Sequence, residues 1–118
     1  MKNDELHLPI KQKWRQMIAA GEKNEEYRDI TPYWTKRLTG LDVDPWDDWR
    51  SIIRHMESWA RADEPCIFRP YTVAVFHCYR PDRDRREIRG FRIGYGNPAW
   101  GAPTDREVFI IELGKKLD

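Results

Sequence analysis

Residues 71–79, with the sequence YTVAVFHCY, decide the fold class. Alternate residues of an extended chain point to opposite sides, so Val73 and Val75 share one face while Ala74 and Phe76 share the other. Both faces are largely apolar and rich in β-branched and aromatic residues, which favours a strand with neighbours on both sides. This stretch therefore predicts a central strand of a β-sheet.

Further strands are expected on the C-terminal side of this stretch. Residues 81–84 have the composition of a turn, residues 88–95 return as a strand, and residues 108–113 form another strand after a segment rich in Gly and Pro. We expect these strands to pair antiparallel.

Helical patterns dominate the N-terminal side. Residues 6–11 alternate weakly, as in a first strand, and residues 12–20 have helical spacing that ends at Gly21. A second helix is expected between the start signal Thr31-Pro32 and Gly40.

A longer third helix is expected from Asp44-Pro45 to a point before Pro65. Its apolar residues form one stripe, which we expect to be buried because a soluble monomer rarely exposes such a patch. The stripe consists of Trp46, Trp49, Ile53, Met56 and Ala60. Trp59 is assigned to the core or to helix docking as well. Helices early and antiparallel strands late indicate an α+β fold.

Composition predicts one folded domain over residues 1–118. Hydrophobic residues make up 40% of the chain, and six Trp, five Tyr and four Phe supply bulky apolar surface that disordered chains lack. The net charge of +1 gives no overall attraction to a polyanion, so any affinity for nucleic acid requires a local patch.

Other classes of protein are not expected from this sequence. Cys66 and Cys78 lack zinc-site spacing and are expected to be buried free thiols in a reducing compartment, with no metal site and no cofactor. No segment has the apolar length of a signal peptide or a membrane span, so we expect a cytoplasmic protein without membrane contact.

Residues 21–28, GEKNEEYR, carry the densest chemistry. We expect residues 22–28 to form a short exposed strand. A lysine and an arginine beside a carboxylate can grip a phosphate, while the carboxylate accepts a base amino group or moves a proton. The alternative is an ordinary network of surface ion pairs, which contributes little to stability.

The octet matches the G-x-K-x-x-E-x-R pattern of the ASCH family. Residues 8–14, 32–38 and 97–103 also resemble small ASCH proteins of phages and prophages, whereas residues 41–65 are the least family-typical part. The resemblance implies a PUA-like fold, a small twisted antiparallel β-barrel whose flanking helices surround a cleft lined by the motif. It also implies RNA or a nucleotide as the partner.

Some family members resemble ribonucleases, and one branch resembles amidohydrolases that act on acylated cytidine. In that branch a threonine nucleophile lies three positions after the motif lysine, and here this position is Glu26. A carboxylate replaces a hydroxyl nucleophile poorly, so we do not expect the amidohydrolase activity to carry over.

The candidate ligand-binding residues are Lys11, Lys23, Glu26, Arg28, Tyr33, Asn97 and Trp100. Lys23 and Glu26 would be the catalytic acid/base pair if the protein is an enzyme. Trp100 lies in an irregular loop and could stack a base, whereas Tyr33 can equally belong to the core. The loop 96–103 and the motif are expected to converge on one cleft.

An arginine-rich segment is interpreted as a solvated hairpin tip because acidic residues interleave with it. Its arginines are Arg80, Arg83, Arg85, Arg86, Arg89 and Arg92.

Three functions compete. The leading hypothesis is a binding module for RNA or a nucleotide, and the first alternative is a ribonuclease or amidohydrolase in the same cleft. The second alternative is a protein-interaction adaptor, which requires the apolar stripe of the 45–62 helix to be exposed.

Overall fold

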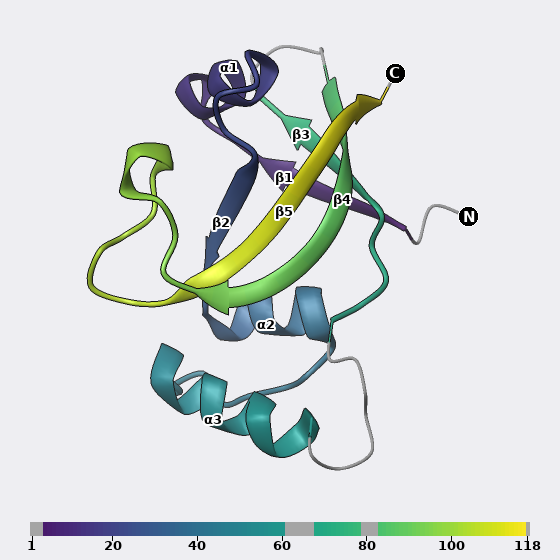
Figure 1. Ribbon diagram of the computed structural model, residues 1–118. Helices are drawn as coiled ribbons and strands as arrows, with labels where there is room; N and C mark the ends of the chain where they lie inside the picture. The colour runs from purple at the N-terminus through teal and green to yellow at the C-terminus, as the bar shows by residue number, and fades with distance from the viewer. Residues whose placement is uncertain (1–3, 61–67, 79–82, 118) are drawn as a thin grey trace.

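The computed structural model describes residues 4–60, 68–78 and 83–117. These residues form three α-helices, a short 3-10 helix and a curled, five-stranded mixed sheet that makes a half-barrel (Figure 1). The elements are β1 (Glu5–Pro9), α1 (Gln12–Ala19), β2 (Glu25–Asp29), α2 (Pro32–Thr39), α3 (Trp49–Ala60), β3 (Val73–His77), β4 (Arg83–Gly94), η1 (Pro98–Trp100) and β5 (Val108–Leu117). The α+β class is confirmed.

The strands lie in the order β1-β3-β4-β5-β2, so β3 has neighbours on both sides, as residues 71–79 predict. Three of the four strand pairs are antiparallel. The pair β1 and β3 is parallel, with Glu5 opposite Val73 and Pro9 opposite His77. The expectation of a wholly antiparallel sheet is therefore wrong. A long connection through α1, β2, α2 and α3 joins these two strands, and parallel pairing needs such a crossover.

The predicted helix boundaries of α2 are confirmed by its capping geometry. The Thr31 hydroxyl accepts a hydrogen bond from the Trp34 amide, and Pro32 occupies the first turn. Gly40 adopts a left-handed conformation with φ of 83° and ends the helix. Gly21, after α1, is also left-handed, with φ of 79°.

The apolar core lies between the sheet and the helices. Leu6, Leu8, Phe76 and Phe109 are fully buried in it, together with Leu38 from α2. Figure 1 shows α2 and α3 at one end of the half-barrel and α1 at the other end. Between these two ends, the loop that follows β4 contacts β2 (Figure 1), where the Asn97 amide donates to the Tyr27 hydroxyl.

The third helix begins later than expected and buries only part of the predicted stripe. α3 starts at Trp49, because the segment after Pro45 forms a turn, and Trp46 is 80% exposed. Ile52 and Met56 are fully buried, while Trp49 and Ile53 are half-buried against the core. Assigning Trp46 to the core is wrong. Trp59 is half-buried.

Strand β4 is longer than predicted and absorbs part of the arginine-rich segment. Arg85 forms an ion pair with Glu5 at 2.9 Å, and Arg86 donates a hydrogen bond to the carbonyl of Ile18 at 2.8 Å. These two arginines connect β4 to β1 and to α1. The expectation that they belong to a solvated hairpin tip is therefore wrong. Arg80 lies outside the described residues.

The remaining expectations concern the cysteines and the membrane. Cys78 is half-buried rather than buried, and its thiol lies 3.1 Å from the side-chain oxygen of Gln12. Cys66 lies outside the described residues. Within residues 4–60, 68–78 and 83–117, no helix is long and apolar enough to cross a membrane.

Candidate functional site

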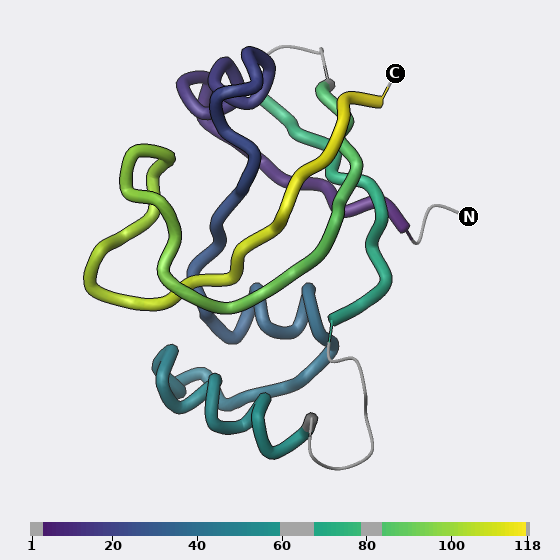
Figure 2. Tube along the Cα trace, in the orientation of Figure 1, coloured from purple at the N-terminus to yellow at the C-terminus, as the bar shows by residue number. Residues whose placement is uncertain are grey.

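A cavity of about 430 Å³ opens between the start of α1, strand β2 and the loop that carries η1. It is lined by Pro9, Ile10, Lys11, Trp14, Glu26, Tyr27, Arg28, Trp100 and Gly101. Figure 2 shows how the loop after β4 turns back toward the segment between α1 and β2. We call this space the motif cavity, because Glu26, Tyr27 and Arg28 belong to the octet.

Lys23 lies beneath the motif cavity and is not part of its lining. Only 1% of this residue is exposed, and its ammonium donates hydrogen bonds to the carbonyl oxygens of Glu25 and Trp100. A third contact, an ion pair of 3.1 Å, joins it to the carboxylate of Glu26. Burial lowers the pKa of Lys23, although the carboxylate of Glu26 opposes this shift. Strand β2 begins only at Glu25, and both Lys23 and Glu26 are buried, so the expectation of a short exposed strand over residues 22–28 is wrong.

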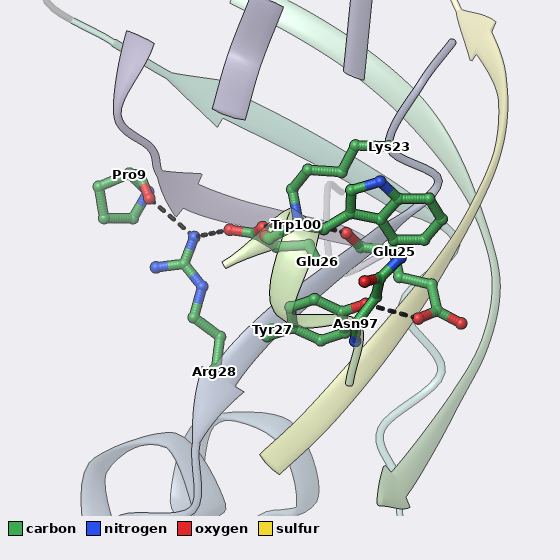
Figure 3. Close-up of polar contacts among 8 residues, drawn as sticks. All are labelled: Pro9, Lys23, Glu25, Glu26, Tyr27, Arg28, Asn97 and Trp100. Carbon is green, nitrogen blue, oxygen red and sulfur yellow. Dashed lines mark hydrogen bonds and ion pairs between the residues drawn. The ribbon is translucent and has the colours of Figure 1, made fainter. Parts of the chain in front are cut away.

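Glu26 and Arg28 form the charged wall of the cavity (Figure 3). The Arg28 guanidinium lies 2.6 Å from one oxygen of the Glu26 carboxylate, and the other oxygen faces Lys23. The same guanidinium donates to the carbonyl of Pro9 at 2.7 Å and lies over the ring of Trp34. Arg28 is thus fixed in orientation by a carboxylate, a carbonyl and an aromatic face.

The charges of this cluster do not cancel. Lys23 and Arg28 are cations and Glu26 is their shared anion, which leaves one excess positive charge. Lys11 adds a further cation at the exposed edge of the cavity. The site therefore favours an anionic ligand, and the protein surroundings reduce screening by solvent.

Tyr27 connects β2 to the loop after β4. Its hydroxyl donates to the carboxylate of Glu25 at 2.7 Å and accepts a hydrogen bond from the amide of Asn97 at 3.0 Å. Burial raises the pKa of Tyr27 above its ordinary range. Gly96 passes so close that a Cβ atom there would lie 2.6 Å from the Tyr27 ring. Glycine is required at position 96 for this contact.

Trp14 and Trp100, together with Tyr27, provide the aromatic lining of the motif cavity. Gly101 follows η1 with φ of 99°, and a Cβ atom there would lie 2.9 Å from the Trp14 ring. The absence of a side chain at Gly101 therefore allows the loop to pack against α1.

The structure brings five of the seven predicted binding residues to one place. Lys11, Glu26, Arg28 and Trp100 line the motif cavity, and Lys23 supports it from below. The expected convergence of the motif with the loop 96–103 is observed.

The other two predicted residues lie elsewhere. The side chain of Asn97 accepts a hydrogen bond from the Ala99 amide and so caps η1, without lining the cavity. Tyr33 is 63% exposed at the start of α2, outside the motif cavity, so core packing is wrong for it.

Sequence reasoning missed two aromatic residues that line the cavity, Tyr27 in the octet and Trp14. Trp14 lies three residues after Lys11 in a correctly predicted helix, and this spacing places both on one side of the first helical turn. In the described part of the chain, no group of three or more His, Cys, Asp or Glu side chains is arranged to hold a metal ion.

Comparison of the chain with protein-family models, curated proteins and solved structures finds no significant match. The geometry of the site and the octet are therefore the observations from which a function is proposed.

Proposed function

We propose that this chain is an ASCH-type domain of PUA-like architecture that binds RNA or a nucleotide in the motif cavity. The observation that carries the proposal is the excess positive charge of the Lys23, Glu26 and Arg28 cluster beside a cavity lined by Trp14 and Trp100. Nucleotides combine an anionic phosphate with a flat aromatic base, and this site offers a partner for each.

Each residue has a distinct role in this proposal. Arg28 contacts the phosphate, because its guanidinium is held in place and lines the cavity. Trp100, which is half-buried, stacks on the base, and Lys11 supplies a second phosphate contact at the rim. Lys23 acts as a positioning residue, since its three contacts fix Glu26 and the carbonyl of Trp100.

An enzyme in the same cavity is the second candidate function, supported by the lowered pKa of Lys23. Binding ranks first for two geometric reasons. The Lys23 ammonium does not line the cavity, and both oxygens of Glu26 are engaged by cations. A general base must reach the proton that it removes.

The test is binding of labelled single-stranded RNA and of nucleoside monophosphates to the purified chain and to Arg28→Ala. We expect Arg28→Ala to weaken binding to both ligands and to reduce the slope of log affinity against log salt for RNA by about 0.7, which corresponds to one phosphate contact. Arg54→Ala is the matched control, because Arg54 is exposed on α3 and lines no cavity described here.

Loss of affinity in Arg28→Ala but not in Arg54→Ala, with unchanged circular dichroism, supports the proposal. If both variants bind with the same affinity as the parent chain, the motif cavity is not the binding site. Absence of any binding to RNA and monophosphates contradicts the proposed function itself.

A further inference from the structure

The motif cavity continues into a second cavity of about 560 Å³ between β2, the start of α2 and the loop before β5. The two cavities share Tyr27, Arg28 and Gly101 in their linings. The second one adds the side chains of Tyr33 and Trp34. A ligand that leaves the motif cavity past Arg28 therefore enters a space bordered by two more aromatic rings.

A third cavity, of about 400 Å³, adjoins the second one at Tyr33. It is lined by Tyr33, Lys36, Arg37, Arg69 and Tyr71. Three of these five residues are cations and none is acidic, and of the three cations Lys36 pairs with Asp42 at 2.7 Å. The three adjoining cavities run from β2 across the exposed ring of Tyr33 to the basic surface of α2.

The arginines of the third cavity belong to the described arginines that have no carboxylate partner, as do Arg50 and Arg54. Within residues 4–60, 68–78 and 83–117, no ion pair joins Arg37 or Arg69 to a carboxylate. Arg37 is held by the carbonyl of His7 and lies over the ring of Trp34. Arg69 is exposed. The exposed guanidinium of Arg69 is thus available to an anion from outside the protein, whereas that of Arg37 already donates to the His7 carbonyl and the Tyr33 hydroxyl.

The middle cavity supplies aromatic surface rather than charge. Its Arg106 pairs with Asp29 at 3.2 Å, so these two residues add no net charge. The ring of Tyr33 packs edge-on against Trp34, with 5.1 Å between ring centroids, yet 63% of Tyr33 is exposed. Such a ring is a fixed and accessible platform for a base.

We infer that these three cavities form one track for a single-stranded polynucleotide, and not only a pocket for one nucleotide. This inference rests on the proposed function. The cation of Arg28, the exposed aromatic ring of Tyr33, and the cations of Arg37 and Arg69 beyond it match the alternation of phosphates and bases along a strand. An acidic peptide would use the two cationic ends but leaves the aromatic middle without a partner.

The first experiment measures affinity against chain length. Monophosphates, dinucleotides and oligonucleotides of about eight residues, as RNA and as DNA, are titrated into the full chain, since one small β-barrel domain covers about 4–16 nucleotides. We expect affinity to rise at least tenfold from the monophosphate to the longest oligonucleotide. Comparing the RNA with the DNA oligonucleotide shows which sugar the track accepts. Tight binding of either one supports the inference.

The second experiment tests the aromatic platform. We expect Tyr33→Ala to weaken oligonucleotide binding about 5- to 150-fold, the range for loss of one base stack, and to leave monophosphate binding unchanged. Tyr33→Phe keeps the ring and should retain most of the affinity. Tyr95→Ala is the matched control, because Tyr95 is 61% exposed and lines none of the three cavities.

The third experiment tests the basic end of the track. Arg69→Ala should reduce the salt slope of oligonucleotide binding by about 0.7 per lost phosphate contact, without affecting the monophosphate. Lys115→Ala removes the same charge from an exposed position on β5 and should have no effect. In Figure 1 this end of β5 points away from α2.

The outcomes separate the track from the proposed function. One outcome would overturn the track and leave the proposed function standing. In it, monophosphates bind in an Arg28-dependent manner, oligonucleotides bind no tighter than monophosphates, and neither Tyr33→Ala nor Arg69→Ala changes oligonucleotide affinity. Competition by polyglutamate that equals competition by the oligonucleotide would also overturn the track, in favour of an acidic protein partner. If neither monophosphates nor oligonucleotides bind, both proposals fail.

Discussion

The ammonium of Lys23 and the main-chain carbonyl oxygen of Trp100 lie 3.1 Å apart, although 77 positions separate the two residues in the chain. This hydrogen bond joins the segment between α1 and β2 to the loop that carries η1. Because the same ammonium also faces Glu26, one buried lysine links the charged and the aromatic parts of the motif cavity.

We predict that Lys23→Met destabilises the fold by about 3 kcal/mol, measured by urea unfolding. Removing one member of a buried ion pair leaves the other charge poorly compensated, and the carbonyl of Trp100 loses its donor. Lys115→Met, at an exposed position, should change stability by less than about 0.5 kcal/mol. The double variant Lys23→Met/Glu26→Gln should be more stable than the sum of the single effects, by about 0.5–3 kcal/mol. Additive effects would contradict the pairing.

Glu26→Gln distinguishes the two candidate functions. The amide keeps the size of the side chain but removes the anion shared by Lys23 and Arg28. A binding module should retain most of its affinity for phosphate-bearing ligands, because the positive charge of the site increases. An enzyme should lose turnover while the ligand still binds. Calorimetry measures the affinity and a product assay on the same RNA measures the turnover. If Glu26→Gln loses binding and the parent chain shows no turnover, both expectations are contradicted.

Tyr27→Phe should change how stability depends on pH. Burial raises the pKa of the folded-state phenol above its usual value of 10.0, so folded and unfolded chains both keep the proton below that pH. Above about pH 10 the unfolded chain ionises first, and stability falls as pH rises. The phenylalanine variant lacks this loss, although at pH 7 it should be about 1 kcal/mol less stable because it loses the hydrogen bonds to Glu25 and Asn97.

The measurement for Tyr27 is urea unfolding of both chains from pH 7 to pH 11. Lys23 has a lowered pKa and acts in the opposite direction, since its unfolded form holds the proton to higher pH. This contribution is present in both chains and cancels in their difference. If the difference in stability between the two chains stays constant from pH 7 to pH 11, the pKa of the Tyr27 phenol is not raised by folding.

Gly101→Ala and Gly21→Ala form a matched pair. Both glycines have positive φ, so each substitution carries a conformational penalty of about 1 kcal/mol. A Cβ atom at Gly21 meets nothing within 4 Å, whereas at Gly101 it would lie 2.9 Å from the Trp14 ring. We therefore expect Gly101→Ala to be the more destabilising change by at least about 1 kcal/mol and to shift the tryptophan fluorescence. If the two substitutions destabilise the protein equally, the predicted contact between Trp14 and the loop is wrong.

Local signals allowed much of the fold to be predicted. Thr31, Pro32 and Gly40 specify α2 through capping chemistry that neighbouring residues complete. The parallel pairing of Glu5 with Val73 has no comparable local signal, because it depends on how a long crossover packs. Alternation predicts that a strand exists, but it does not select the partner of that strand.

The candidate site was predicted in its composition and not in its burial. The octet named Lys23, Glu26 and Arg28. Alternation along β2 places Glu26 and Arg28 on one face, whereas Lys23 reaches Glu26 from the segment before the strand. The burial of Lys23 could not be predicted, because the residue that covers it, Trp100, lies in a distant loop. The predicted burial of Trp46 is wrong for a different reason. Residues 45–46 form a turn and the helix begins only at Trp49, so Trp46 lies outside the helix and its side chain is exposed.

The order of strands has a consequence for synthesis of the chain. Both outer strands of the sheet, β1 and β2, come from the first 29 residues, whereas their partners β3 and β5 begin at Val73 and Val108. On the ribosome, β2 must therefore emerge long before the strand that completes its hydrogen bonds, and contacts of such long sequence separation form slowly. The nascent chain therefore carries the octet before the strand that pairs with it, and the proposed function requires that ligand binding begins only after translation has passed β5.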